Sequence, residues 1–165
     1  MRYKIIFLLC LFSASLHAQN SLDELFKKFN ENSVPYISVE ELRDLKKDGN
    51  LAILDAREFE EYEVSHIKNS LFVGYNAYSP EIVSATIKDL STPIVVYCSL
   101  GIRSENISEK LKAAGFTNVR NLYGGIFEWK NKQNPVFDSE EKETDKVHTY
   151  SKNWSKWLTN GEKIY

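Results

Sequence analysis

Cysteine is scarce in this sequence, since only positions 10 and 98 of the 165 residues carry one. The three histidines show no spacing typical of metal ligands, so we expect no metal site. No apolar run reaches the roughly 20 residues that cross a membrane. No basic run is long enough to follow a nucleic-acid backbone, and there are no internal repeats. With a net charge of −2 and a 42% hydrophobic fraction, the chain fits one ordinary globular domain.

Residues 1–18 have the pattern of a secretory signal peptide. Arg2 and Lys4 precede an apolar core, and small residues lead to Ala18, after which we expect cleavage. An uncleaved membrane anchor is the alternative, although the apolar run is short for a span. We therefore expect a periplasmic or secreted protein that is free of the membrane after cleavage. Removal of this segment leaves Cys98 as a single thiol that cannot form an internal disulfide in an oxidising compartment.

The most informative stretch runs from Ile94 to Ser104. A short β-branched run after Pro93 is typical of a strand buried on both faces, and apolar residues recur at helical spacing after Arg103. Cys98 therefore lies in a loop between the carboxyl end of a strand and the start of a helix, which is the usual ligand position in open α/β sheets. Unpaired backbone N–H groups of the first helical turn favour negative charge there.

This loop has the features that activate a thiol. Its amides can solvate a thiolate, Gly101 permits a tight backbone turn, and Arg103 adds a positive charge. Such surroundings lower the pKa of a cysteine from about 8.5 to roughly 3.5–7.5. A buried structural cysteine is the alternative.

Three motifs in the same order resemble the rhodanese-like sulfurtransferases. The segment from Cys98 to Arg103 resembles their active-site loop. Asp55-Ala56-Arg57 with the downstream His66-Ile67 is similar to their Asp-x-Arg and His-Ile motifs. The run from Leu122 through Gly124-Gly125 to Trp129, followed by Pro135-Val136, is similar to their Gly-Gly-x-x-x-Trp ending.

Strand and helix patterns alternate along the chain, which predicts an α/β fold with an open, mostly parallel sheet and helices on both faces. We expect a signal peptide (1–18), an N-terminal helical segment (19–33), a rhodanese-like domain (34–137) and a charged linker with a C-terminal amphipathic helix (138–165). In that helix Val147, Tyr150, Trp154 and Trp157 would share one apolar face, packed on the parent domain or on a protein partner.

The resemblance implies a catalytic mechanism and a site. Cys98 would take sulfane sulfur from a small donor (thiosulfate, a persulfide or a polysulfide) and pass it to a thiol or to cyanide, with Arg103 stabilising the leaving anion and no cofactor. Asp55 and His66 would give structural support. The remaining residues of the predicted site would bind substrate, with Arg57 adding positive charge near the mouth: Ser99, Leu100, Gly101, Ile102, Ser104 and Arg57.

One departure from the family pattern concerns the loop. Many members carry a basic residue directly after the cysteine, whereas here Ser99 is followed by apolar Leu100. We therefore expect weak activity with the thiosulfate dianion and a preference for less charged persulfides or polysulfides.

Competing functions use the same residues. A cysteine-dependent phosphatase would also need Cys98 and Arg103, but such enzymes have one residue more between them than the four found here. A non-catalytic rhodanese-like binding module is a further alternative, which the intact Cys98 and Arg103 disfavour. A Cys98–His66 protease pair lacks an identifiable orienting group.

Overall fold

The computed structural model describes residues 22–165, so the predicted signal peptide lies outside the described residues. The described residues fall into two units, residues 22–32 and residues 33–165. In the first, residues 22–29 are helical and lie within the segment (19–33) for which we expected a helix. Among the described residues, no helix is both long and apolar enough to span a membrane.

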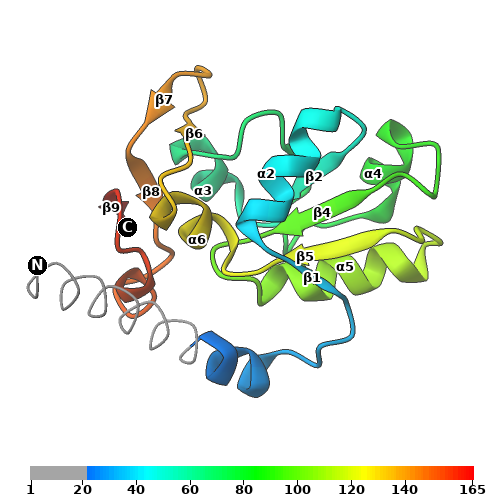
Figure 1. The fold of residues 1–165 in the computed structure, drawn as a ribbon, viewed down its shortest axis with the longest axis horizontal. Coiled ribbons are helices and arrows are strands. Elements are labelled where there is room, and N and C mark those ends of the chain that lie inside the picture. The colour runs from blue at the N-terminus through cyan, green and yellow to red at the C-terminus, as the bar shows by residue number, and fades with distance from the viewer. Residues whose placement is uncertain (1–21) are drawn as a thin grey trace, which may run out of the picture. The chain divides into compact units, whose positions relative to one another are not determined.

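The second unit alternates strands and helices, as predicted. Its first ten elements are β1 (Tyr36–Ile37), α2 (Val39–Asp48), β2 (Ala52–Asp55), α3 (Phe59–Val64), β3 (Leu71–Phe72), α4 (Pro80–Thr86), β4 (Ile94–Tyr97), α5 (Arg103–Ala113), β5 (Val119–Leu122) and α6 (Gly125–Asn131). The strands form one parallel sheet in the order β1-β5-β4-β2-β3, with β4 at its centre (Figure 1).

Local sequence signals account for the positions of these elements. Every residue of β4 is buried, as expected for a β-branched strand that is covered on both faces. Helix α2 begins with a capping box, in which Ser38 and Glu41 bond reciprocally to each other's backbone amides. It ends at Gly49, whose left-handed backbone conformation (φ 75°) terminates the helix.

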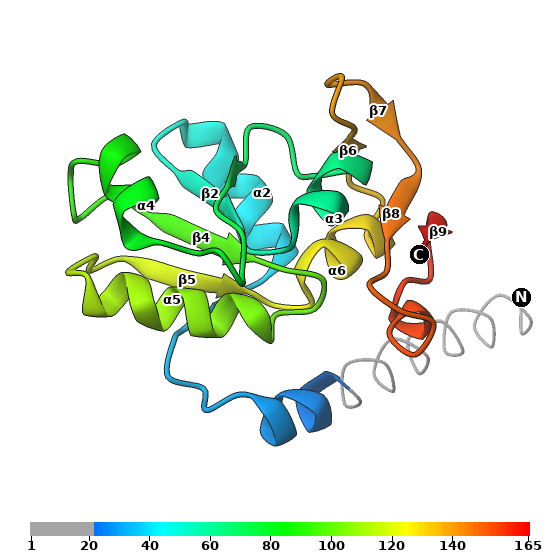
Figure 2. The ribbon, with the colours of Figure 1, turned by 180° about the vertical axis from the view of Figure 1, so that it is seen from behind.

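Helices cover both faces of the sheet, as predicted (Figures 1 and 2). On one face, Val83 of α4 and Ile107 and Leu111 of α5 join a buried apolar cluster with residues of β2, β4 and β5. Helices α2 and α6 lie on the other face. Because the strands are parallel, their carboxyl ends share one edge, where Asp55 of β2 is in register with Tyr97 of β4. Cys98 follows directly at that edge.

The predicted C-terminal helix is wrong. Residues after α6 form β6 (Val136–Phe137), β7 (Glu143–Thr144), β8 (Lys146–His148), a short 3₁₀ helix η1 (Ser155–Trp157) and β9 (Glu162–Ile164). Strand β6 pairs antiparallel with β7, so part of the expected solvated linker is a strand, and β8 pairs parallel with β9. Tertiary contacts outweigh the helical spacing here, because Val147 is fully buried in β8.

The segment from β8 to β9 is fastened to the end of α6. The Asn131 side chain donates to the carbonyl of Trp157 (2.9 Å) and accepts from the amide of Thr159 (2.7 Å). Lys130 Nζ donates to Asp145 Oδ1 (2.7 Å), and Leu158 is fully buried. This segment, residues 145–164, therefore has a fixed position on its own domain.

Candidate active site

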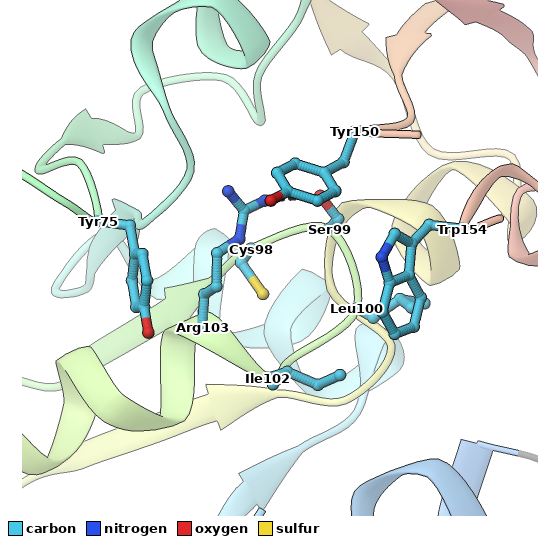
Figure 3. Close-up of a pocket in the computed structure, with 8 residues that line it drawn as sticks. All are labelled: Tyr75, Cys98, Ser99, Leu100, Ile102, Arg103, Tyr150 and Trp154. Atoms are coloured by element: carbon cyan, nitrogen blue, oxygen red, sulfur yellow. Dashed lines mark hydrogen bonds between the residues drawn. The ribbon is translucent and has the colours of Figure 1, made fainter. Parts of the chain in front are cut away.

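Cys98 lines a pocket of about 220 Å³ at the carboxyl edge of the sheet (Figure 3). The loop from Cys98 to Arg103 forms one side of the pocket, and Tyr75 lies opposite. The lining residues are Tyr75, Cys98, Ser99, Leu100, Ile102, Arg103, Tyr150 and Trp154. The structure therefore brings the predicted loop residues together at the thiol.

Two donors face the sulfur of Cys98. The Gly101 amide lies 3.1 Å from Sγ, and the Ser104 hydroxyl lies 3.4 Å from it. Gly101 has φ 119°, a backbone conformation that favours glycine. Asn121 positions both groups, because its Nδ2 donates to the Gly101 carbonyl (2.8 Å) and its Oδ1 lies 2.7 Å from the Ser104 hydroxyl. The single proton of that hydroxyl can be directed either to Oδ1 or to the Cys98 sulfur. Asn121 is a site residue that the sequence did not reveal.

The start of α6 supports the loop from behind. The amides of Ile126 and Phe127 donate to the carbonyls of Cys98 (2.9 Å) and Ser99 (3.2 Å). Gly125 permits this contact, since a Cβ atom there would lie 2.2 Å from the Cys98 carbonyl oxygen. The Gly-Gly motif thus holds the loop carbonyls away from the pocket.

The environment of Cys98 favours the thiolate. Burial opposes ionisation of the thiol and has the largest single effect on its pKa. The positive charge of Arg103 and the hydrogen bonds from Ser104 and Gly101 together outweigh it, so the pKa of Cys98 lies below its usual value. A buried thiolate held by donors at a helix start is a nucleophile.

Glu61 pairs with Arg103, and sequence reasoning missed it. Its two carboxylate oxygens accept from Arg103 at 2.6 and 2.8 Å, and Oε1 also accepts from the Ser99 hydroxyl at 3.0 Å. The Glu61 side chain is 2% exposed and that of Arg103 17%. Burial acts to raise the pKa of Glu61, but the bonds and charge of Arg103 prevail and the pKa is lowered. Arg103 therefore faces the pocket as half of an ion pair.

Arg57 does not lie near the pocket mouth, which corrects our expectation for it. The residue is 0% exposed and forms a bidentate pair with Asp55, with Nη2 2.6 Å from Oδ2. Its Nη2 also donates to the Ser65 carbonyl (2.6 Å), and the Tyr97 hydroxyl donates to Asp55 (2.6 Å). The carboxylate draws the guanidinium inward, so this pair joins β2 and β4 to the segment after α3, and neither residue lines the pocket.

His66 is also buried away from the pocket lining. Its ring stacks on Tyr62 with a centroid distance of 4.1 Å, and its nitrogens lie 3.3 Å from the Tyr62 carbonyl and from Glu141. Its backbone pairs with Phe137. The positions of Asp55 and His66 suit a supporting role.

Tyr150 and Trp154 complete the pocket from the segment that we expected to be a helix. The Tyr150 ring stacks over the Arg103 guanidinium, 5.0 Å from centroid to Cζ, and Trp154 stands beside Leu100 (Figure 3). The only signal in the sequence was the cluster of aromatic residues itself. Within residues 22–165, no group of His, Cys, Asp or Glu side chains could hold a metal ion.

Comparisons with known proteins show which family this domain resembles. The model of the rhodanese-like domain family matches residues 38–132. A tRNA uridine(34) hydroxylase from Hamiltonella defensa is 35% identical over 97 residues, which cover 57% of this chain and 27% of that protein. The chain thus spans about a quarter of the length of that curated relative.

Two solved structures are similar. The first is a thiosulfate sulfurtransferase from Pseudomonas aeruginosa, with a TM-score of 0.60 and 27% identity over 66% of this chain and 21% of that one. The second is a human single-domain sulfurtransferase, with a TM-score of 0.52 and 25% identity over 61% of this chain and 98% of that one.

Proposed function

Because this chain belongs to the family of rhodanese-like domains, we propose that it transfers sulfane sulfur from a persulfide or polysulfide to a thiol acceptor through a persulfide on Cys98. The observation that carries the proposal is the geometry at the thiol. Cys98 lines the pocket, and the Gly101 amide and the Ser104 hydroxyl lie 3.1 and 3.4 Å from its sulfur. These donors stabilise an anion on sulfur before and after transfer.

The reaction has two steps, each of which exchanges one S–S bond for another. In the first, the Cys98 thiolate attacks the terminal sulfur of a donor R–S–SH, a Cys98–S bond forms, and the donor S–S bond breaks. The leaving thiolate RS⁻ takes the electron pair, and the sulfur arrives with its proton. In the second, an acceptor thiolate attacks the terminal sulfur, and Cys98 leaves as the thiolate. No cofactor is required, because the covalent intermediate carries the group.

The charges around the pocket support a donor of low charge. Arg103 is the cation of the lining, and Glu61 already neutralises it through two hydrogen bonds. A dianion such as thiosulfate would lose hydration on entry without gaining an unpaired cation. A persulfide carries at most one negative charge, so it loses less hydration free energy when it enters the pocket.

Intact-protein mass spectrometry tests the proposal. After incubation with a persulfide donor and removal of excess, the protein should carry one additional sulfur atom, which a thiol or cyanide then removes. The Cys98→Ser variant should not gain this sulfur atom, because Cys98 is the free cysteine among the described residues. A wild-type protein that never acquires sulfur would refute sulfur transfer and favour the binding-module alternative.

The phosphatase alternative needs its own assay. Hydrolysis of an aryl phosphate should be undetectable with the wild type. Turnover that Cys98→Ser abolishes would replace our proposal with phosphoryl transfer.

A further inference from the structure

We propose that Tyr150 and Trp154 form an aromatic subsite that binds the organic group of the sulfur donor, and that this donor is a persulfide with a small apolar or aromatic substituent. This inference rests on the proposed function and adds the class of substrate. The two residues lie outside the span that the family model matches, residues 38–132. Selectivity would thus come from a part of the chain that the family match does not include.

The pocket walls are mainly apolar or aromatic. Leu100, Ile102 and Trp154 form one side, and Tyr75 stands opposite across the Cys98 sulfur (Figure 3). The Tyr75 hydroxyl donates to Asn106 (2.9 Å). Pockets that bind organic ligands have such walls with a few fixed polar groups. Here the thiol and the groups around it provide the polar end.

The Tyr150 ring limits the access of a ligand to the Arg103 guanidinium. It lies over the guanidinium face while Glu61 holds the guanidinium edge, so the cation is covered from two directions. The chain thus places an aromatic surface where an anion-binding site would need an open cation. This arrangement suits an uncharged substituent on the donor sulfur.

The backbone that carries the aromatic wall is held in place before a ligand arrives, although the Tyr150 side chain is itself exposed. Tyr150 adopts φ 63°, an unusual conformation for a residue with a side chain, and its amide donates to His148 Nδ1 (3.1 Å). Strands β8 and β9 close the segment on both sides, and α6 fastens its far end through Asn131. A wall that is already ordered loses little conformational entropy on binding.

The volume of the pocket limits the ligand. At about 220 Å³ it is smaller than the 300–1,000 Å³ of typical ligand sites, so it suits a compact substituent of a ring or a short branched chain. Hydrosulfide or cyanide would contact the thiol but not the aromatic wall. A benzyl group is a suitable probe because it is compact, uncharged and aromatic.

Alkylation of Cys98 tests the subsite without sulfur transfer. Rates with N-benzyliodoacetamide and iodoacetamide are compared, each relative to a small free thiol. The wild type should favour the benzyl reagent, and Trp154→Ala and Tyr150→Ala should each reduce this preference by about 3- to 10-fold. Trp154→Phe should retain most of it. The matched control is Tyr165→Ala, which removes an exposed aromatic of the same region that does not line the pocket.

Sulfur transfer from benzyl persulfide and from 2-hydroxyethyl persulfide gives the second readout. Trp154→Ala should lower kcat/KM for the benzyl donor and leave the hydroxyethyl donor nearly unchanged. An equal loss with both donors would show that Trp154 only shapes the loop, which overturns the proposal. Benzyl preference in alkylation without any sulfur transfer would refute the proposed function and leave the subsite intact. Transfer without benzyl preference in either assay would refute the subsite alone.

Discussion

Replacing Arg103 by methionine should destabilise the protein far more than replacing Glu61 by glutamine. Glu61 is 2% exposed, so Arg103→Met leaves a buried carboxylate without its cation. Removing one partner of a buried pair costs about 3–5 kcal/mol, against about 0–1 kcal/mol for a surface pair. In Glu61→Gln the guanidinium is 17% exposed and can reach water, so we expect a loss of about 1–3 kcal/mol.

The double variant Arg103→Met/Glu61→Gln should recover part of the stability. In the wild type the Glu61 carboxylate accepts from the Ser99 hydroxyl (3.0 Å) and from the Glu58 amide (3.1 Å) through different oxygens. After Glu61→Gln, the carbonyl oxygen of the new side chain can still accept from the Glu58 amide, and its NH2 group can donate to Ser99 Oγ. Urea unfolding of the four proteins gives the coupling energy, which we expect to be at least about 2 kcal/mol. A coupling energy below about 1 kcal/mol would refute our interpretation of the pair as buried.

The pH dependence provides an independent check. In the wild type the pKa of Glu61 is lowered, so its contribution to stability is present above the unfolded-state pKa and is lost as pH falls through the folded one. In Arg103→Met the pKa of the unpaired carboxyl should instead be raised. The deficit of this variant relative to the wild type should then be large near pH 7 and shrink towards about pH 4. A deficit that does not vary with pH would contradict the assignment.

Three further predictions concern the loop, its support and the N-terminus. Ser104→Ala removes a donor to the Cys98 sulfur, so the midpoint of iodoacetamide alkylation against pH should rise, and an unchanged midpoint would exclude this role. Gly125→Ala should lower the free energy of unfolding in urea by more than about 2 kcal/mol, because its Cβ would meet the Cys98 carbonyl. Gly49 also has a positive φ but has open space around it, so Gly49→Ala should lower this free energy by only about 1 kcal/mol. Equal losses in the two variants would contradict the steric argument. N-terminal sequencing of the protein made in an exporting bacterial host should find Gln19 first, whereas Met1 retained in a soluble cytoplasmic protein would contradict export.

The sequence predicted the sheet and the reactive loop because both depend on short-range signals. A β-branched run, Gly101 and the helical spacing after Arg103 were enough to place Cys98 between β4 and α5. The family motifs added the order of the remaining segments. These features are local, so tertiary contacts did not alter them.

The partners of the loop could not be predicted in the same way. Glu61 is one of several acidic residues in and around α3, and nothing in their spacing shows which one faces Arg103. Arg57 was misplaced because a strand-end arginine can point to solvent or inward, and the Asp55 carboxylate decides this only in three dimensions. Tyr150 and Trp154 have helical spacing, but pairing of β8 with β9 overrides it.

Because the chain is synthesised from its N-terminus, the reactive loop is made before the aromatic wall of the pocket. The loop with Cys98 leaves the ribosome well before Tyr150, Trp154 and the strand β9 that closes their segment. The five-stranded sheet and the helix α6 that supports the loop are both made before Tyr150 and Trp154, so the thiol can reach its activating amides while one side of the pocket is still absent. During that interval the nucleophile of the nascent protein would lack the aromatic wall, and with it the selectivity that we propose for the finished pocket.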